Sequence, residues 1–81
     1  MFLIQFSPVA AKLEHRKILG ETIRTVRKRA CISQEALAEM ADLHHNFIGE
    51  IERGEKAASI DTLVKLSEAL GVKVSDLVAD V

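Results

Sequence analysis

Polar side chains that can form hydrogen bonds recur on one side of a short helical pattern near the middle of the chain. An Asn side chain can bond an adenine edge through two hydrogen bonds, and a Glu carboxylate can accept one from the cytosine amino group. The spacing i, i+1, i+4, i+5 and i+8 places these residues opposite the apolar Ile48 and Ile51 on a helix. We therefore expect this face to be able to read base pairs in a major groove. Its members are His45, Asn46, Gly49, Glu50 and Arg53.

A second helical pattern precedes this face and has to position it. Ser33 is a good N-cap, and residues 34–41 follow with apolar side chains at helical spacing. A tight turn at 42–44 leads to a helix over 45–53, which Gly54 ends. Two helices this short cannot bury their apolar residues alone, so they predict a helix-turn-helix unit within a small all-helical domain. The residues of the first of these helices that we expect to face inward are Leu37, Met40 and Ala41.

Helical spacing predicts three further helices around this unit. The first covers about 17–29 and is a candidate for continuity with 8–16, because Ser7-Pro8 resembles a helix start. Another runs from a cap at Ser59 to Gly71, and a last short one starts at Ser75-Asp76. The apolar residues expected on the inner sides are Leu19, Ile23, Val26 and Ala30, then Ile60, Leu63, Val64 and Leu70, then Leu77 and Val78.

These patterns together predict an all-α fold of five helices in one domain. We expect the helix-turn-helix domain over residues 17–81, preceded by a short apolar N-terminal extension over residues 1–16. Gly20 is expected to mark a kink or a close helix crossing. Trp and Tyr are absent while 48% of residues are hydrophobic, so the core must be aliphatic.

Charge is divided unevenly along the chain, although the net charge is only −1. Residues 1–32 carry seven Lys or Arg against two Asp or Glu, and residues 33–81 carry four against ten. A localised basic edge is enough to contact phosphates, because the field near the docking face matters more than the global sum. The basic residues that dominate this edge are Arg24, Arg27, Lys28 and Arg29.

The residues do not indicate a disulfide, a metal site, an active site or a membrane segment. The lone Cys31 cannot form an intramolecular disulfide, and one Cys with three His lacks the spacing of a zinc site. Adjacent residues such as His44 and His45 diverge by about 100° on a helix and chelate one ion poorly. We expect no enzyme activity, no metal and no cofactor. MFLIQF is too short for a signal peptide or a membrane span, so the expected location is cytoplasmic, without membrane association.

The stretches SQEALAEMA, FIGEIERG and IDTLVKLSEALGVKVSDL resemble the lambda-repressor-like, XRE-type helix-turn-helix regulators over about residues 18–78. The resemblance implies a five-helix fold that binds double-stranded operator DNA, commonly as a two-fold dimer. It implies that Gln34 lies near a phosphate and that Arg53 lies near the DNA backbone. It also implies a structural ion pair between Arg27 and Glu52, which would bridge the first and third helices.

Three positions depart from the usual pattern of that family. Asp42 stands where Gly is common, so it must adopt a left-handed backbone or a modified turn. His44 replaces the usual Ser or Thr, which removes a good N-cap while leaving His44 among the candidate DNA-binding residues. His45 stands where longer polar side chains are frequent. Glu50 repels phosphate, so it is either a specificity element or the intramolecular partner of a nearby base.

We predict a homodimeric, sequence-specific transcription regulator, with repression as the simplest consequence of binding a palindromic operator. The alternative is an antitoxin-like or adaptor module that acts through a protein partner. MFLIQF pairs as a β-strand with a second copy, packs on the domain, or is disordered, and the first two together are favoured. A core role for the C-terminal apolar residues is as well supported as an interface role. The candidate dimer contacts are Phe2, Ile4, Leu77, Val78 and Val81.

Overall fold

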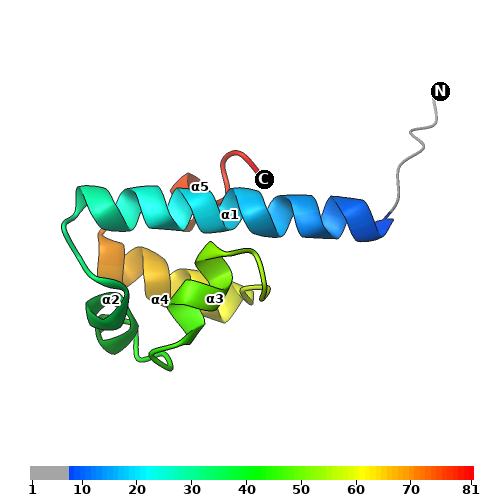
Figure 1. The fold of residues 1–81 in the computed structure, drawn as a ribbon. Helices are drawn as coiled ribbons and strands as arrows, with labels where there is room; N and C mark the ends of the chain where they lie inside the picture. The colour runs from blue at the N-terminus through cyan, green and yellow to red at the C-terminus, as the bar shows by residue number, and fades with distance from the viewer. Residues whose placement is uncertain (1–7) are drawn as a thin grey trace.

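The computed structural model describes the backbone of residues 8–81 and the side chains from Glu14 onward. The described chain forms five helices and no strand, as the sequence predicts. Figure 1 shows α1 running along one side of the molecule, with α2, α3 and α4 gathered beneath it. The helices are α1 (Pro8–Arg29), α2 (Gln34–Met40), α3 (Phe47–Glu52), α4 (Ile60–Leu70) and α5 (Val74–Leu77).

Helix α1 is continuous from Pro8, so the two segments considered from the sequence form a single helix. Proline occupies its first position, where its fixed φ suits a helix and its missing N–H costs nothing. The N-terminal part of α1 projects beyond the other helices (Figure 1). The packed part of the domain therefore begins well inside α1.

Four of the described helices end with the same backbone conformation. In each, a residue with left-handed φ follows the last turn, and its own N–H and that of the next residue bond back to carbonyls of that turn. Gly54 and Gly71 adopt this conformation at no steric cost, whereas Cys31 (φ 58°) and Asp42 (φ 56°) adopt it without being glycine. The left-handed backbone expected for Asp42 is confirmed. Cys31 lies exposed in the α1–α2 turn.

Hydroxyl caps begin the two helices for which the sequence predicts them. Ser33 Oγ accepts from the N–H of Ala36 at 3.0 Å, and Ser59 Oγ accepts from Thr62 at 3.1 Å. Helix α5 begins at Val74, one residue before the predicted start, because the Asp76 carboxylate caps the chain one residue earlier, at the N–H of Lys73. Each of these bonds satisfies an N–H that the helix itself leaves unpaired.

Helix α3 is shorter than the predicted 45–53. The N–H of Phe47 bonds to His44 O, three residues back, so the chain enters the helix through a tighter turn over His45 and Asn46. Asn46 already has helical dihedral angles (φ −83°, ψ −16°). The polar face therefore spans this entry turn and the short helix together.

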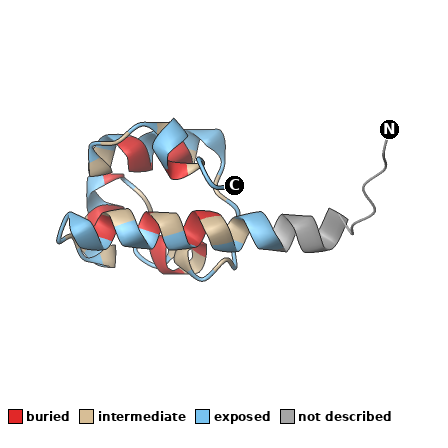
Figure 2. Cartoon of the chain, turned by 90° about the horizontal axis from the view of Figure 1, so that it is seen from above, coloured by how far each residue is buried: buried red, intermediate tan, exposed pale blue. Residues whose placement is uncertain are grey.

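The core lies where the helices face one another, and Figure 2 shows the buried residues concentrated there. It is aliphatic, as the composition requires, and the helices that surround it are joined by short connections. The contacts of α3 with α1 and α2 bring the helix-turn-helix unit against the long helix. The buried apolar residues are Leu19, Ile23, Leu37, Ala38, Ala41, Ile48, Ile51, Leu63, Leu66 and Leu77.

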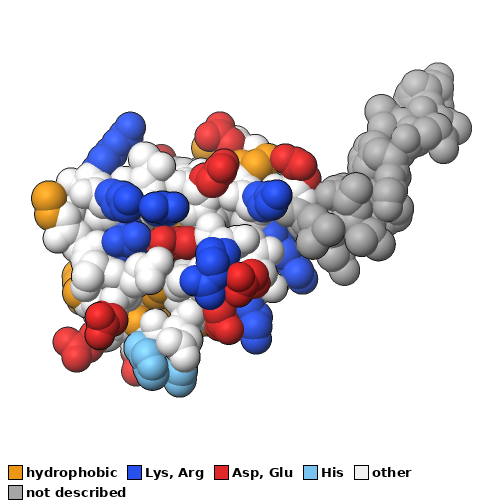
Figure 3. Space-filling model, in the orientation of Figure 1, with side chains coloured by type: hydrophobic (Ala, Val, Ile, Leu, Met, Phe, Trp, Pro, Cys, Tyr) orange, Lys and Arg blue, Asp and Glu red, His pale blue; other side chains and the backbone are white. Residues whose placement is uncertain are grey.

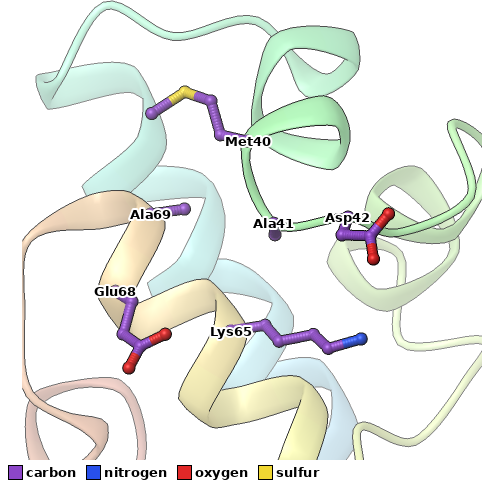
Figure 4. A pocket seen from close by; sticks show the side chains of 6 residues that line it. All are labelled: Met40, Ala41, Asp42, Lys65, Glu68 and Ala69. Carbon is purple, nitrogen blue, oxygen red and sulfur yellow. The ribbon is translucent and has the colours of Figure 1, made fainter.

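Four residues that we expected to face inward are exposed. Met40 ends α2 and lines an open hollow between α2 and α4, shown in Figure 4 with Lys65 and Glu68 on its other side. Ile60 and Val64 lie on the outer side of α4, because Leu63, Leu66 and Ser67 make its buried side. Ala30 follows the end of α1 and is also exposed.

Gly20 allows α1 and α3 to cross closely, one of the two roles that the sequence suggests for it. A Cβ at this position would lie 2.3 Å from Ile51 O and 2.7 Å from Glu52 O, both backbone atoms. No L side chain fits without separating the helices. The crossing therefore fixes how α3 is held on the domain.

Candidate nucleic-acid interface

The outer side of α3 and its entry turn gather the polar side chains predicted to lie together. His44, His45 and Asn46 are exposed in the turn. Glu50 is half-buried, and the side chain of Arg53 is 59% exposed. The apolar Ile48 and Ile51 are buried on the opposite side. The structure thus separates a packed side of α3 from a side rich in hydrogen-bonding groups.

Gly49 lies on this outer side but is covered, so its expected role as a groove-facing residue needs correction. A Cβ at Gly49 would lie 2.9 Å from Arg53 Nη1 and 3.4 Å from Gln34 Oε1. The side chains of Arg53 and Gln34 therefore occupy the space that a larger residue would fill. Gly49 contributes by allowing those two polar groups to lie close to the helix backbone.

A carboxylate at the end of α3 connects three helices. Arg27 donates from Nε to Glu52 Oε2 at 2.6 Å and from Nη2 to Glu52 Oε1 at 3.0 Å. Gln34 Nε2 donates to the same Oε1 at 2.9 Å, and Arg27 Nη1 donates to Ile32 O at 2.8 Å. The two charged side chains are 9% and 3% exposed. This pair, which the resemblance implied, holds α1, α2 and α3 in fixed relation.

The pKa values of this pair reflect their mutual contacts. Burial by itself would raise the pKa of Glu52, but hydrogen bonds from Arg27 and Gln34, with the charges of Arg27 and Arg24, lower it below the ordinary value. The hydrogen bond to Glu52 raises the pKa of Arg27 against the opposing effect of burial. The pair is charged at neutral pH, and the charge of Arg24 acts on Glu52 from the same side of α1.

His44 accepts a hydrogen bond within the entry turn that precedes α3. His44 Nδ1 accepts from the N–H of Asn46 at 3.2 Å, as a Ser or Thr oxygen would. Helix α3 itself has no side-chain cap, as expected, because its N-cap residue Asn46 makes no capping hydrogen bond. For Nδ1 to accept, a neutral ring must carry its proton on Nε2. The His44 and His45 rings stack with centroids 4.4 Å apart, which orients both on the exposed edge.

Arg53 has a partner that the sequence pattern did not reveal. Its Nε donates to Glu55 Oε2 at 2.8 Å and its Nη2 donates to Glu55 Oε1 at 3.2 Å. The hydrogen bond to Glu55 raises the pKa of Arg53, and the nearby charges of Glu50 and Glu52 act in the same direction. Helical spacing cannot predict this contact, because the left-handed Gly54 folds Glu55 back toward the helix.

The basic edge of α1 differs in part from the expectation. Arg27 is buried in its ion pair and is unavailable to phosphates, whereas Arg24 and Lys28 are exposed and one turn apart. Arg29 lines a groove between α1 and α5 with Asp76 and Asp80, away from α3. Figure 3 shows Lys and Arg side chains over α1 and beside α3 with Asp and Glu among them, and His at the edge. This face is mixed in charge rather than uniformly basic.

The candidate dimer contacts fall in different environments. Leu77 is fully buried within the domain, so its core role applies and it cannot touch a second chain. Val78 is half-buried against the core, and Val81 is 55% exposed. Phe2 and Ile4 lie outside the described residues. Of the expected contacts, Val81 is the described residue with the most free surface.

No described helix is long and apolar enough to cross a membrane. No three His, Cys, Asp or Glu side chains among the described residues come together to hold a metal ion.

The arrangement has counterparts among known proteins. Residues 23–77 match the family model described as helix-turn-helix. The control protein C.BamHI of Bacillus amyloliquefaciens is 43% identical over 63 residues, 76% of this chain and 78% of that protein. The control protein C.SmaI of Serratia marcescens is 38% identical over 65 residues, 80% of this chain and 77% of that protein.

A solved structure extends the likeness to the backbone. The restriction-modification controller protein C.AhdI from Aeromonas hydrophila superposes with a TM-score of 0.75 at 31% identity. The match covers 76% of this chain and 94% of that one. Residues 23–77, which the family model matches, contain α2 and α3, so the polar side of α3 belongs to the shared fold rather than to an appended segment.

Proposed function

The chain belongs to the helix-turn-helix family, and from this premise we propose that it is a sequence-specific DNA-binding regulator of transcription. The observation that carries the proposal is the outer side of α3, where exposed polar groups stand on a helix whose other side is locked to α1 and α2. Such rigid support is what base reading requires, because a displaced side chain loses its hydrogen bonds. Its similarity to control proteins supports a regulatory role of the same kind.

In this proposal, α3 and its entry turn enter the major groove. An α-helix is about 10–12 Å across with its side chains, which fits a groove about 12 Å wide. Asn46 reads an adenine, His45 offers ring nitrogens to neighbouring base edges, and Glu50 accepts from a cytosine amino group. Glu50 makes no ion pair among the described residues, which favours its specificity role over a purely intramolecular one.

Phosphates are contacted from the flanks of this face. Gln34 lies at the start of α2 beside Gly49, with Nε2 held by Glu52 and its carbonyl oxygen toward α3. Its second amide hydrogen remains for a phosphate oxygen. Arg24 is an exposed basic residue of α1 whose charge acts on Glu52, and the exposed Lys28 follows it one turn along the helix. These contacts set the register of the protein on the duplex, while the bases set its sequence preference.

We further propose that the protein acts as a homodimer on a palindromic operator in the cytoplasm, and that binding represses transcription by blocking polymerase. A two-fold dimer would place the two α3 helices in half-sites about 10 bp apart. Sedimentation with and without DNA tests this arrangement. A monomer at tens of micromolar under both conditions would contradict it.

Replacement of Asn46 tests the base-reading face. Asn46→Ala is expected to weaken binding to the selected operator by about 1–3 kcal/mol while leaving binding to random DNA nearly unchanged, because it removes a base contact. Thr25→Ala is the matched control, since Thr25 is exposed on the α1–α5 side. Equal losses on all DNA sequences would mean that Asn46 does not read a base.

Selection from a randomised operator library tests the function itself. Wild-type protein should enrich one sequence with two-fold symmetry at moderate salt. If no sequence is enriched even at low salt, the protein is an adaptor or antitoxin-like module, and a protein partner must be sought.

A further inference from the structure

Arg53 is paired with Glu55 in the absence of DNA. Glu55 takes the Nε hydrogen and one Nη2 hydrogen through two hydrogen bonds of 2.8 and 3.2 Å. Glu55 thus binds the edge of the guanidinium formed by Nε and Nη2, not the edge formed by the two terminal nitrogens Nη1 and Nη2. Of the five N–H donors of an arginine, three remain, two on Nη1 and one on Nη2. These lie at the end of the side chain, where they form a second fork.

The guanidinium also lies farther into the reading face than its place in the sequence suggests. Side chains on a helix lean toward its N-terminus, and Arg53 follows this rule by lying over Gly49, one turn back. Its Nη1 is 2.9 Å from where a Cβ of Gly49 would stand, on the side that also holds Gln34 Oε1. The free fork is therefore beside the middle of α3 rather than beyond its C-terminal end.

We propose that Arg53 reads a guanine through this free fork and that Glu55 is the positioning residue that aims it. Two parallel N–H groups match the O6 and N7 acceptors of guanine in the major groove. The proposal deepens the DNA-binding function proposed above and rests on it. It assigns a base contact to a residue that the resemblance alone would place near the DNA backbone.

The charge of Glu55 favours a base over a phosphate as the target. A phosphate that approached Arg53 would bring a second negative charge close to the Glu55 carboxylate, and the two would repel. A guanine edge offers acceptors without a net charge. It can therefore bind the free N–H groups of Arg53 while Glu55 keeps its hydrogen bonds to Nε and Nη2. Glu50 and Glu52 also act on Arg53 by their charge and strengthen the same preference.

Operator selection with three variants tests the assignment. Arg53→Lys keeps the charge but loses the planar fork, so it should reduce guanine preference at one position of each half-site, by up to the about 5- to 150-fold that a bidentate contact supplies, with the salt dependence retained. Gly49→Ala should weaken the same preference, because its Cβ would displace Nη1. Glu55→Gln should also weaken it, while binding to random DNA rises because a negative charge is lost.

Glu68→Gln is the matched control for charge, because Glu68 is an exposed residue of α4 and takes no part in this contact. It should leave the guanine preference unchanged. Thermal unfolding of each variant verifies that it is folded. The assignment of Arg53 is overturned if Arg53→Lys changes no base preference, or if Arg53→Ala weakens all sequences equally and lowers the salt slope by about 1.

The outcomes separate this inference from the function on which it rests. If wild-type protein enriches no operator, the DNA-binding function fails and the inference fails with it. If it enriches an operator that lacks a guanine sensitive to Arg53, only the inference fails. If Arg53→Lys reduces the preference but Glu55→Gln does not, Glu55 is not the positioning residue.

Discussion

Helix α3 presents one side to α1 and α2 and the other side to solvent, and the two sides are built from different kinds of contact. On the inner side, Gly20 brings α1 against the backbone carbonyls of Ile51 and Glu52. On the outer side, Gly49 is covered by the ends of two flexible side chains, those of Arg53 and Gln34. Both glycines permit a close approach, but only one approach involves backbone atoms.

This difference determines what a substitution on each side affects. Backbone atoms at a helix crossing cannot move without moving a whole helix, so changes on the inner side should reduce the free energy of unfolding. Side-chain ends can rotate away at small cost, so changes on the outer side should alter DNA recognition and leave the fold intact. Stability and recognition are therefore separable within a helix of six residues.

The largest expected effect on the inner side comes from breaking the buried ion pair. Arg27→Met should lower the free energy of unfolding by about 3–5 kcal/mol, because it leaves the Glu52 carboxylate buried without its charged partner. Urea unfolding at neutral pH measures this. The double variant Arg27→Met/Glu52→Gln should recover part of the lost stability. A loss below about 1 kcal/mol in Arg27→Met would contradict the view that the inner side of α3 stabilises the fold.

The same substitution at the two glycines gives the most direct comparison. Gly20→Ala should lower the free energy of unfolding by about 1–3 kcal/mol, because its Cβ would clash with backbone carbonyls. Gly49→Ala should change it by no more than about 1 kcal/mol, since the gain in helix propensity offsets the displaced side chains. Thermal or urea unfolding of both variants provides the test. Equal losses would show that the outer side is as tightly packed as the inner one.

A smaller effect should appear in the pH dependence of stability. The pKa of Glu52 is lower in the folded chain than in the unfolded chain, where it is about 4.3. Its contribution is therefore complete above that value and is lost as the pH falls through the lower, folded-state pKa. Unfolding measured between neutral pH and about pH 3 should show this loss in the wild type. Glu52→Gln should show less pH dependence in the same range, and an unchanged profile would exclude Glu52 as its source.

The periodicity of the sequence predicted most of the fold because each helix carries its own local signals. Ser33 and Ser59 cap α2 and α4, and Gly54 and Gly71 follow the ends of α3 and α4. Exposure of individual apolar residues was less predictable. Met40, Ile60 and Val64 have the right spacing for burial. The neighbouring helices, however, pack against other faces of α2 and α4, so these three side chains are exposed.

The candidate site was predictable where it depends on residue type and unpredictable where it depends on contacts across a turn. The polar character of His45, Asn46 and Glu50 follows from the residues themselves. The pairing of Arg53 with Glu55 depends on the path of the chain around Gly54. The hydrogen bond that His44 accepts from Asn46 depends on a ring nitrogen reaching a specific N–H, which residue preferences do not predict.

The sequence by itself determined that the described residues form five helices and that α3 has one apolar and one polar side, because helical periodicity and capping are local properties. Only the tertiary structure decided how those sides are used. It placed Glu52 where three helices meet, buried Arg27 and Leu77, and laid Arg53 over Gly49 with Glu55 at its side. Such contacts join residues through packing and turns, so the distances that decide their chemistry exist only in the folded chain.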